Sequence, residues 1–115
     1  DIRARRRFDD CVAQTAYPVD IHNEHNLVLI HLEPGEYYEI PYRCLVTREV
    51  DNLLVAGRCA SATFAAQSSM RIQLVCMALG EAAGIAAAMN PDVRAVNGAQ
   101  VRQRMQAHGA AFAGR

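Results

Sequence analysis

The segment of residues 70–89 constrains the fold most, because almost every side chain in it is apolar. Arg71, Gln73 and Glu81 are its strongly polar residues. A helix of this length spans about 30 Å at the α-helical rise. Because the apolar residues surround the helix instead of following one stripe, we predict a long helix that is buried on most sides.

Small residues recur at every fourth position of this segment, at Gly80, Gly84 and Ala88. Such a stripe lets another backbone approach the helix closely. Asn90-Pro91 predicts where the helix ends. A membrane span is the alternative, but Glu81 lies within the segment and alanine dominates its second half. A span requires about 20 strongly apolar residues, so we favour the buried helix.

Strands are predicted before this helix. Residues 27–32 and 36–40 flank Pro34-Gly35, a strong turn signal, and predict a β-hairpin over residues 27–40. Residues 53–57 are apolar at consecutive positions and follow Asp51-Asn52. This pattern is typical of a strand buried on both faces, as in a parallel sheet.

A short helix is predicted near the C-terminal end. Residues 99–107 carry Val101 and Met105 at helical spacing, with Arg and Gln between them, and His108-Gly109 ends the pattern. The expected fold is therefore α/β: a small sheet, made of a β-hairpin plus one buried strand, with a long buried helix and a short C-terminal helix. Residues 1–115 read as a single unit.

The charge balance excludes some partners. Twelve basic residues, all arginine, face twelve acidic ones, so the formal net charge is zero. No strong field for nucleic acid or membrane is expected. Arg3, Arg5, Arg6 and Arg7 cluster without interleaved aromatics, which favours a solvated end over an RNA site. We expect neither a nucleic-acid partner nor a membrane.

Cysteine and histidine spacing argues against a metal site. Cys11, Cys44, Cys59 and Cys76 contain no CxxC pair, and we expect reduced, buried thiols in a cytoplasmic protein. A strand would place His25 and His31 on one face, and His22 is near them in sequence. No nearby Cys or tight carboxylate set completes a site, so no metal is expected.

Arg43 follows Pro41-Tyr42 and leaves two readings open. Its guanidinium either orients an anionic substrate or pairs with a carboxylate such as Glu39.

The chemistry-bearing unit is the predicted buried strand ending at Gly57, a loop over residues 58–68, and the long helix that starts near Ser69. Open α/β sheets bind ligands beyond the carboxyl ends of their strands. The first turn of a helix offers unpaired N–H groups and the positive end of the macrodipole. Gly57 allows a ligand to approach the backbone closely. Plain core packing explains the same pattern and stays open at this point.

Four separate blocks, in register, resemble FAD-dependent oxidoreductases related to the succinate dehydrogenase and fumarate reductase flavoproteins. Residues 51–59, DNLLVAGRC, resemble the last flavin-domain strand of that family. Met70-Arg71 followed by CMALGEAAG at residues 76–84 resembles its final flavin-facing helix. YPVDIH at residues 17–22 and EIPYRCL at residues 39–45 precede them in the same order. The resemblance covers residues 5–110.

This resemblance implies a cofactor and its contacts. The chain would be the C-terminal portion of a larger FAD/NAD(P)-binding fold, positioning FAD for hydride transfer. Gly57 and Arg58 would lie near the FAD ribityl and pyrophosphate. The helix N-terminus facing the flavin ring would carry Ser69, Arg71, Ile72 and Gln73. His22 would lie close to the flavin or substrate. Catalytic residues are not identified.

The phosphate-binding motif of such proteins is absent from this sequence, which has no GxGxxG. We therefore expect these residues alone to bind FAD weakly and to need the missing N-terminal FAD-binding portion as partner. Two departures bear on substrate chemistry: relatives often carry His near Phe64 and Gly near Ser68. The alternative is a non-enzymatic protein, either a truncated remnant or a module that covers its apolar helix by forming a homo-oligomer.

Overall fold

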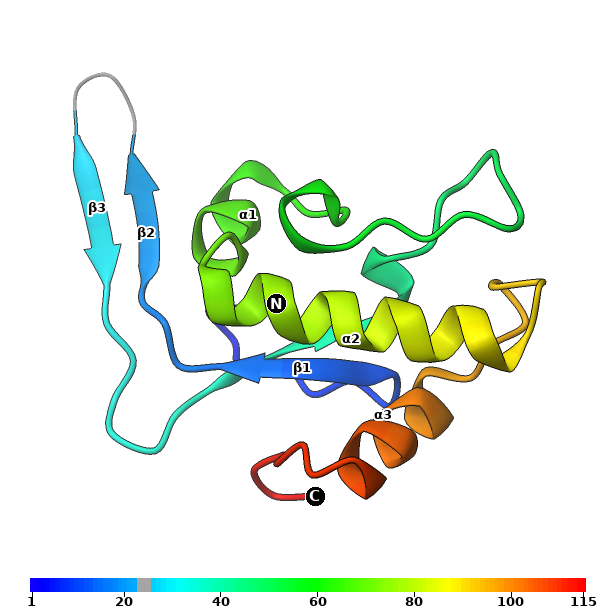
Figure 1. Ribbon diagram of the computed structural model, residues 1–115. Coiled ribbons are helices and arrows are strands. Elements are labelled where there is room, and N and C mark those ends of the chain that lie inside the picture. The colour runs from blue at the N-terminus through cyan, green and yellow to red at the C-terminus, as the bar shows by residue number, and fades with distance from the viewer. Residues whose placement is uncertain (23–25) are drawn as a thin grey trace.

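The computed structural model describes residues 1–22 and 26–115 of the chain. It is a small α/β fold with two antiparallel strand pairs and three α-helices (Figure 1), which confirms the expected class. The elements are β1 (Cys11–Thr15), β2 (Val19–His22), β3 (Leu27–Ile30), β4 (Tyr38–Pro41), α1 (Phe64–Met70), α2 (Gln73–Met89) and α3 (Gly98–Ala107), with short 3-10 turns η1 (Tyr42–Cys44) and η2 (Gly57–Cys59).

The predicted hairpin over residues 27–40 is wrong in its pairing. A turn does form at Pro34-Gly35, where the Glu36 N–H donates to the Glu33 carbonyl at 2.9 Å. The two strands beside it nevertheless pair elsewhere, β3 with β2 and β4 with β1. All four residues of β4 are buried, whereas β3 is largely exposed. β4 pairs with β1, whose first three residues are buried, and burial of both strands in the core outweighs proximity in sequence.

The predicted strand over residues 53–57 is not a strand in this structure. Only an isolated bridge joins Leu54 to Val46, and the Val55 N–H donates to the Leu45 carbonyl at 2.8 Å. Leu53 is exposed and Gly57 begins η2. A strand buried on both faces needs a hydrogen-bonded neighbour on each side, and the described residues supply only this single bridge.

The long helix exists but is divided. α1 ends at Met70, Arg71 and Ile72 interrupt the helical path, and α2 begins at Gln73, with a bend of 95° between the two helices. Residues 64–68, predicted as loop, belong to α1, because the Thr63 side chain caps that helix. α2 ends at Met89, directly before Asn90-Pro91, as predicted. α3 begins at Gly98, one residue before the predicted start, and is capped by Asn97.

The prediction that α2 is buried on most sides is also wrong. Its buried residues are Val75, Leu79, Ala82 and Ala86, which follow one stripe. On the opposite face, Leu74 is 75% and Met77 is 65% exposed. The outer face of α2 is therefore apolar and uncovered by the described chain.

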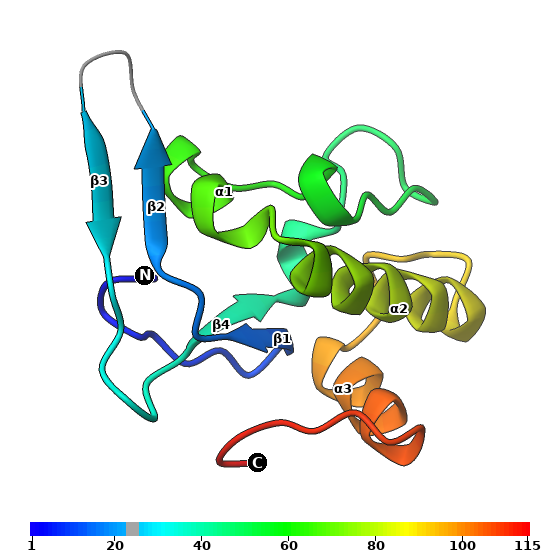
Figure 2. The same cartoon turned by 60° about the vertical axis from the view of Figure 1, so that its left-hand side comes forward.

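The core lies where α2 and α3 pack against β1. Figure 1 shows β1 running between the two helices, and Figure 2 shows the β2–β3 pair standing apart from them, beside α1. The largest fully buried side chains of the core include Tyr38, Ile40, Leu45 and Leu79. Within the described residues, no single helix has the length and hydropathy of a membrane span, whereas α1 and α2 taken together pass that test as a bent pair.

The four cysteines are free, as predicted, but not all of them are buried. Cys11 is buried, Cys44 and Cys76 are half-buried, and Cys59 is exposed. Burial, followed by the charge of the nearby Glu39 carboxylate, raises the pKa of the Cys11 thiol to about 11. Cys59 is exposed because η2 places it on the surface instead of in a strand.

Candidate functional site

The N-terminus of α2 differs from those of α1 and α3 in having no side-chain cap. In α1 the Ala66 N–H donates to Thr63 Oγ1 at 3.4 Å, and in α3 the Ala99 N–H donates to Asn97 Oδ1 at 2.8 Å. The residue preceding α2 is Ile72, whose side chain has no group that accepts a hydrogen bond. The first-turn N–H groups of α2 are thus left for another partner, at the positive end of the helix dipole.

Gly57 packs against this same end of α2. A Cβ placed on Gly57 would lie 3.4 Å from the Cys76 Cβ, in the first turns of the helix. Its φ of +66° lies in the left-handed region, which favours glycine. The predicted proximity of Gly57 to the start of the long helix is therefore confirmed, although the strand expected before Gly57 is not formed.

Arg58 follows on the surface, and its loop is tied to α1. The Gln67 side-chain amide donates to the Arg58 carbonyl at 2.7 Å. The Arg58 side chain belongs to an exposed residue. The backbone beside Gly57 is thus held in place while the guanidinium faces solvent.

Arg71, Ile72 and Gln73 surround the beginning of α2, whereas Ser69 lies apart from it. Gln73 is the first residue of the helix and is exposed. Ser69 is fully buried in α1, its carbonyl accepts from the Tyr38 hydroxyl at 3.3 Å, and its Oγ has no partner among the described residues. Gly57 packs against the first turns of α2, and Arg71, Ile72 and Gln73 lead into that helix, whereas Ser69 belongs to α1, because the long helix starts at Gln73 instead of near Ser69.

Phe64 and Ser68, the two positions that were expected to depart from the pattern of the resembled family, lie on α1. Phe64 is exposed at the first residue of that helix, and Ser68 is buried, donating to the Ala65 carbonyl at 2.8 Å. Neither side chain supplies a titratable group.

A polar group lies beside this helix start: it joins His22 and Arg71, which the resemblance implied near the flavin, to Asp20, which it did not. His22 Nε2 is 2.9 Å from Asp20 Oδ1, and Arg71 Nη2 is 3.9 Å from Asp20 Oδ2. The Tyr17 hydroxyl is 3.5 Å from the same Oδ2. The alternation of Asp20 and His22 along a strand was the available signal, because residues two apart share a face.

The metal hypothesis receives no support from the geometry. Within residues 1–22 and 26–115, no three His, Cys, Asp or Glu side chains gather as a metal site requires. His25 lies outside the described residues.

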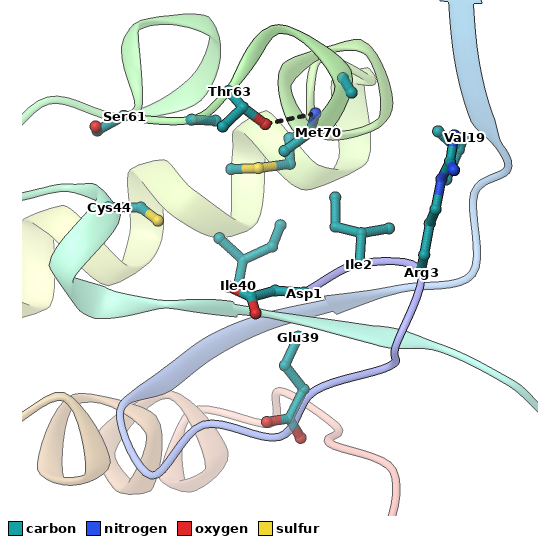
Figure 3. Close-up of a pocket in the computed structure, with 13 residues that line it drawn as sticks. Asp1, Ile2, Arg3, Val19, Glu39, Ile40, Cys44, Ser61, Thr63 and Met70 are labelled. Atoms are coloured by element: carbon teal, nitrogen blue, oxygen red, sulfur yellow. Dashed lines mark hydrogen bonds between the residues drawn. The ribbon is translucent and has the colours of Figure 1, made fainter.

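A pocket of about 420 Å³ lies elsewhere, between the N-terminal residues, β4 and α1 (Figure 3). Its lining is mainly apolar and includes Ile2, Ile40, Ala66 and Met70. None of the six expected cofactor-binding residues lines it. The open end of α2 is therefore separate from this cavity.

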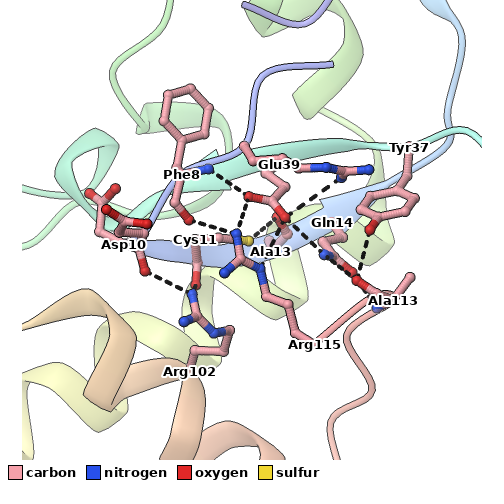
Figure 4. Close-up of polar contacts among 12 residues, drawn as sticks. Phe8, Asp10, Cys11, Ala13, Gln14, Tyr37, Glu39, Arg102, Ala113 and Arg115 are labelled. Atoms are coloured by element: carbon pink, nitrogen blue, oxygen red, sulfur yellow. Dashed lines mark hydrogen bonds and ion pairs between the residues drawn. The ribbon is translucent and has the colours of Figure 1, made fainter.

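The most enclosed charge belongs to Glu39, which holds the chain ends together (Figure 4). Its carboxylate is 2.9 Å from Arg115 Nη2 and accepts from the Phe8 N–H at 2.7 Å and from Gln14 Nε2 at 3.2 Å. Burial works to raise the pKa of Glu39, but these hydrogen bonds outweigh it and hold the pKa below its usual range. The Glu39 carboxylate therefore stabilises the fold by joining the N-terminal and C-terminal segments.

Arg43 pairs with a carboxylate, which was one of its two predicted roles, but the partner is Asp10 instead of Glu39. Its Nη2 lies 2.6 Å from Asp10 Oδ1, and its Nε donates to Asp10 Oδ2 at 3.0 Å. This bidentate pair joins η1 to the residue before β1.

Comparison with known proteins gives one result. The sequence model of a family described as FAD dependent oxidoreductase matches residues 1–105. No curated protein and no solved structure matches the chain.

Proposed function

We propose that this chain, which belongs to the FAD dependent oxidoreductase family, forms the wall that positions FAD for hydride transfer, with the N-terminus of α2 facing the flavin ring. The observation that carries the proposal is this uncapped helix end, with the Gly57 backbone packed against it. FAD supplies the two-electron chemistry when bound. We also propose a relation to the succinate dehydrogenase and fumarate reductase flavoproteins, on the four sequence blocks.

The residues around the helix end suit a flavin nucleotide. Unpaired N–H groups and the helix dipole stabilise negative charge, which the pyrimidine edge of a flavin gains on reduction. Gly57 has no side chain to obstruct a ligand, and Arg58 offers a cation for the pyrophosphate. Arg71, Ile72 and Gln73 would flank the ring. We leave Ser69 to the α1 core, where its side chain is enclosed.

The pyrophosphate grip must come from outside these residues, because the sequence contains no GxGxxG. We propose that the glycine-rich FAD-binding portion of the same protein is the partner of this chain. The outer face of α2 offers the surface for it: Leu74 and Met77 are exposed, and a Cβ on Gly80 or Gly84 would meet no atom within 4 Å. The chain alone is then expected to be colourless.

A charge placed at the helix end tests the proposal. Gln73→Glu puts a carboxylate at the first residue of α2, where it would oppose the negative charge of the reduced flavin. In the FAD-bound protein we expect the flavin midpoint potential to fall by about 20 mV, the equivalent of about 1 kcal/mol for two electrons. Spectroelectrochemical titration measures it.

Gln103→Glu is the matched control, because Gln103 is exposed on α3. Its potential should stay at the wild-type value. Equal potentials in the wild type and both variants would refute the placement of the flavin at this helix end.

Self-association is the second candidate function, favoured by the exposed apolar face of α2. A homo-oligomer would bury Leu74 and Met77 without any flavin. Light scattering over a range of protein concentrations distinguishes the flavin-site role from self-association. A mass near 12.6 kDa at all concentrations supports the flavin-site role, and a multiple of that mass supports self-association.

A further inference from the structure

The Asp20 carboxylate and the His22 imidazole lie close together on one face of β2. His22 Nε2 and Asp20 Oδ1 are 2.9 Å apart. The Asp20 side chain is only 15% exposed, whereas the His22 side chain is 60% exposed. The carboxylate is thus held within the fold and the imidazole is accessible to a small molecule.

Two further contacts fix the carboxylate. Arg71 Nη2 lies 3.9 Å from Asp20 Oδ2, and the Tyr17 hydroxyl lies 3.5 Å from the same oxygen. Arg71 directly precedes Ile72, the residue before the uncapped end of α2. Figures 1 and 2 show β2 running beside α1, whose C-terminal end meets α2. The pair therefore lies next to the helix end assigned above to the flavin.

The Asp20 carboxylate approaches Nε2 of the imidazole, so Nδ1 is the ring nitrogen that is not in contact with Asp20. The described charged or titratable groups around the imidazole are Asp20 and Tyr17 on its own side of β2 and Arg71 from the helix junction. On β3 the paired residue is the apolar Leu27.

We propose that His22 is the proton acceptor of the hydride-transfer reaction, with Asp20 as its positioning residue; this inference rests on the proposed function. The substrate is a compound with a dissociable proton next to its hydride-donating carbon, as in an alcohol. Its hydroxyl proton passes to His22 Nδ1 while the carbon gives its hydride to FAD. The C–H and O–H bonds break, a carbonyl forms, and two electrons reduce the flavin. The reverse reaction returns the proton from His22.

Diethyl pyrocarbonate tests the pair without a known substrate, because it reacts with the unprotonated nitrogen of imidazole. The labelling rates of His22 and His108 are followed by peptide mass spectrometry in the protein with and without FAD. His108 is the internal control, since it is exposed at the end of α3. Flavin absorbance reports separately whether FAD is bound.

In the FAD-free protein we expect His22 to be labelled at least about threefold faster than His108, because the carboxylate holds the imidazole in one orientation with Nδ1 accessible to the reagent. Asp20→Asn should reduce the His22 rate to that of His108, and Asp20→Glu should restore part of the difference. Bound FAD should slow labelling of His22 by at least about threefold and leave His108 unchanged, because the cofactor would cover one residue only.

Two results would overturn the inference. One is equal labelling of His22 and His108 in the wild type; the other is full labelling of His22 while absorbance shows bound FAD. Fast, Asp20-dependent labelling in a protein that takes up no FAD even when the glycine-rich FAD-binding portion is present would refute the proposed function, while the reactive pair itself would stand.

Discussion

The two strand pairs of this molecule reverse the usual relation between hydropathy and burial. β3 has the sequence LVLI and its first three residues are exposed, whereas β4 has the sequence YEIP and is buried throughout. The β1–β4 pair contacts α2 and α3 through β1, while the β2–β3 pair contacts α1 and stands at the side of the molecule (Figure 2). Position in the fold, and not the apolar content of the strand, decides which pair is enclosed.

The difference shows which strand pair is covered by the rest of the chain and which is left exposed. β4 encloses even a glutamate, because Glu39 receives hydrogen bonds from the N-terminal and C-terminal segments. β3 leaves Leu27, Val28 and Leu29 in solvent, and its outer edge has no paired strand among the described residues. Such an edge is a surface on which another chain segment pairs. The side with β3 and the outer face of α2 is where the rest of a flavoprotein would pack.

The largest effect is expected from comparing two leucines on the two faces of α2. Leu79 is fully buried, and Leu79→Ala should lower the free energy of unfolding by about 3 kcal/mol through lost burial and a cavity. Leu74→Ala removes the same atoms from the exposed face and should change stability by less than about 0.5 kcal/mol. Urea unfolding followed by circular dichroism measures both. Similar losses for the two variants would show that the outer face of α2 is already covered, by a second copy.

A smaller effect is expected from removing the buried charge of Glu39 in the enclosed β1–β4 pair. Glu39→Gln should lower the free energy of unfolding by about 2 kcal/mol, because Arg115 and the Phe8 N–H lose a charged acceptor. Glu36→Gln is the control: that carboxylate pairs with Arg5 at the surface and should matter much less.

The pH dependence of stability gives the sign of the Glu39 contribution. The pKa of Glu39 is lowered from its ordinary value of 4.5, because the hydrogen bonds that favour the charged form outweigh burial. A lowered pKa means that the stabilisation is fully present above the unfolded pKa and is lost as the pH falls through the folded one. Wild type and Glu39→Gln should therefore converge in stability below pH 4.5. A difference that persists unchanged in acid would contradict an ionic role.

Local signals allowed the ends of helices to be predicted. Asn90-Pro91 ends α2 and His108 follows the last residue of α3, because each of these residues acts on backbone within a few positions of itself. The break at residues 71–72 contains neither Pro nor Gly, and apolar residues continue through it. Only packing of α1 against β2 explains why the chain turns there, and packing is invisible to a local pattern.

The candidate site was predictable in part for the same reason. Gly57 was expected beside the long helix, because strand, loop and helix follow one another in sequence, and this holds although the strand is absent. The contact of Asp20 with Arg71 joins residues 51 positions apart, so spacing could not indicate it. Ser69 was assigned to the wrong helix, because the division between α1 and α2 was not expected. The roles of the six residues toward FAD stay predictions.

The smallest effects are expected from two glycines at α2: Gly57, which packs against Cys76, and Gly80, which lies one turn further along the helix. Gly57 has a φ of +66°, and a Cβ there would lie 3.4 Å from the Cys76 Cβ, so Gly57→Ala should cost about 1–2 kcal/mol of unfolding free energy. Gly80 lies inside the helix and its Cβ would meet no atom within 4 Å, so Gly80→Ala should stabilise the chain by about 0.5–1 kcal/mol. Thermal unfolding of both variants beside the wild type measures the difference in sign. A loss of stability in Gly80→Ala would mean that a backbone already occupies the outer face of α2, and the comparison between a covered and an exposed side would fail.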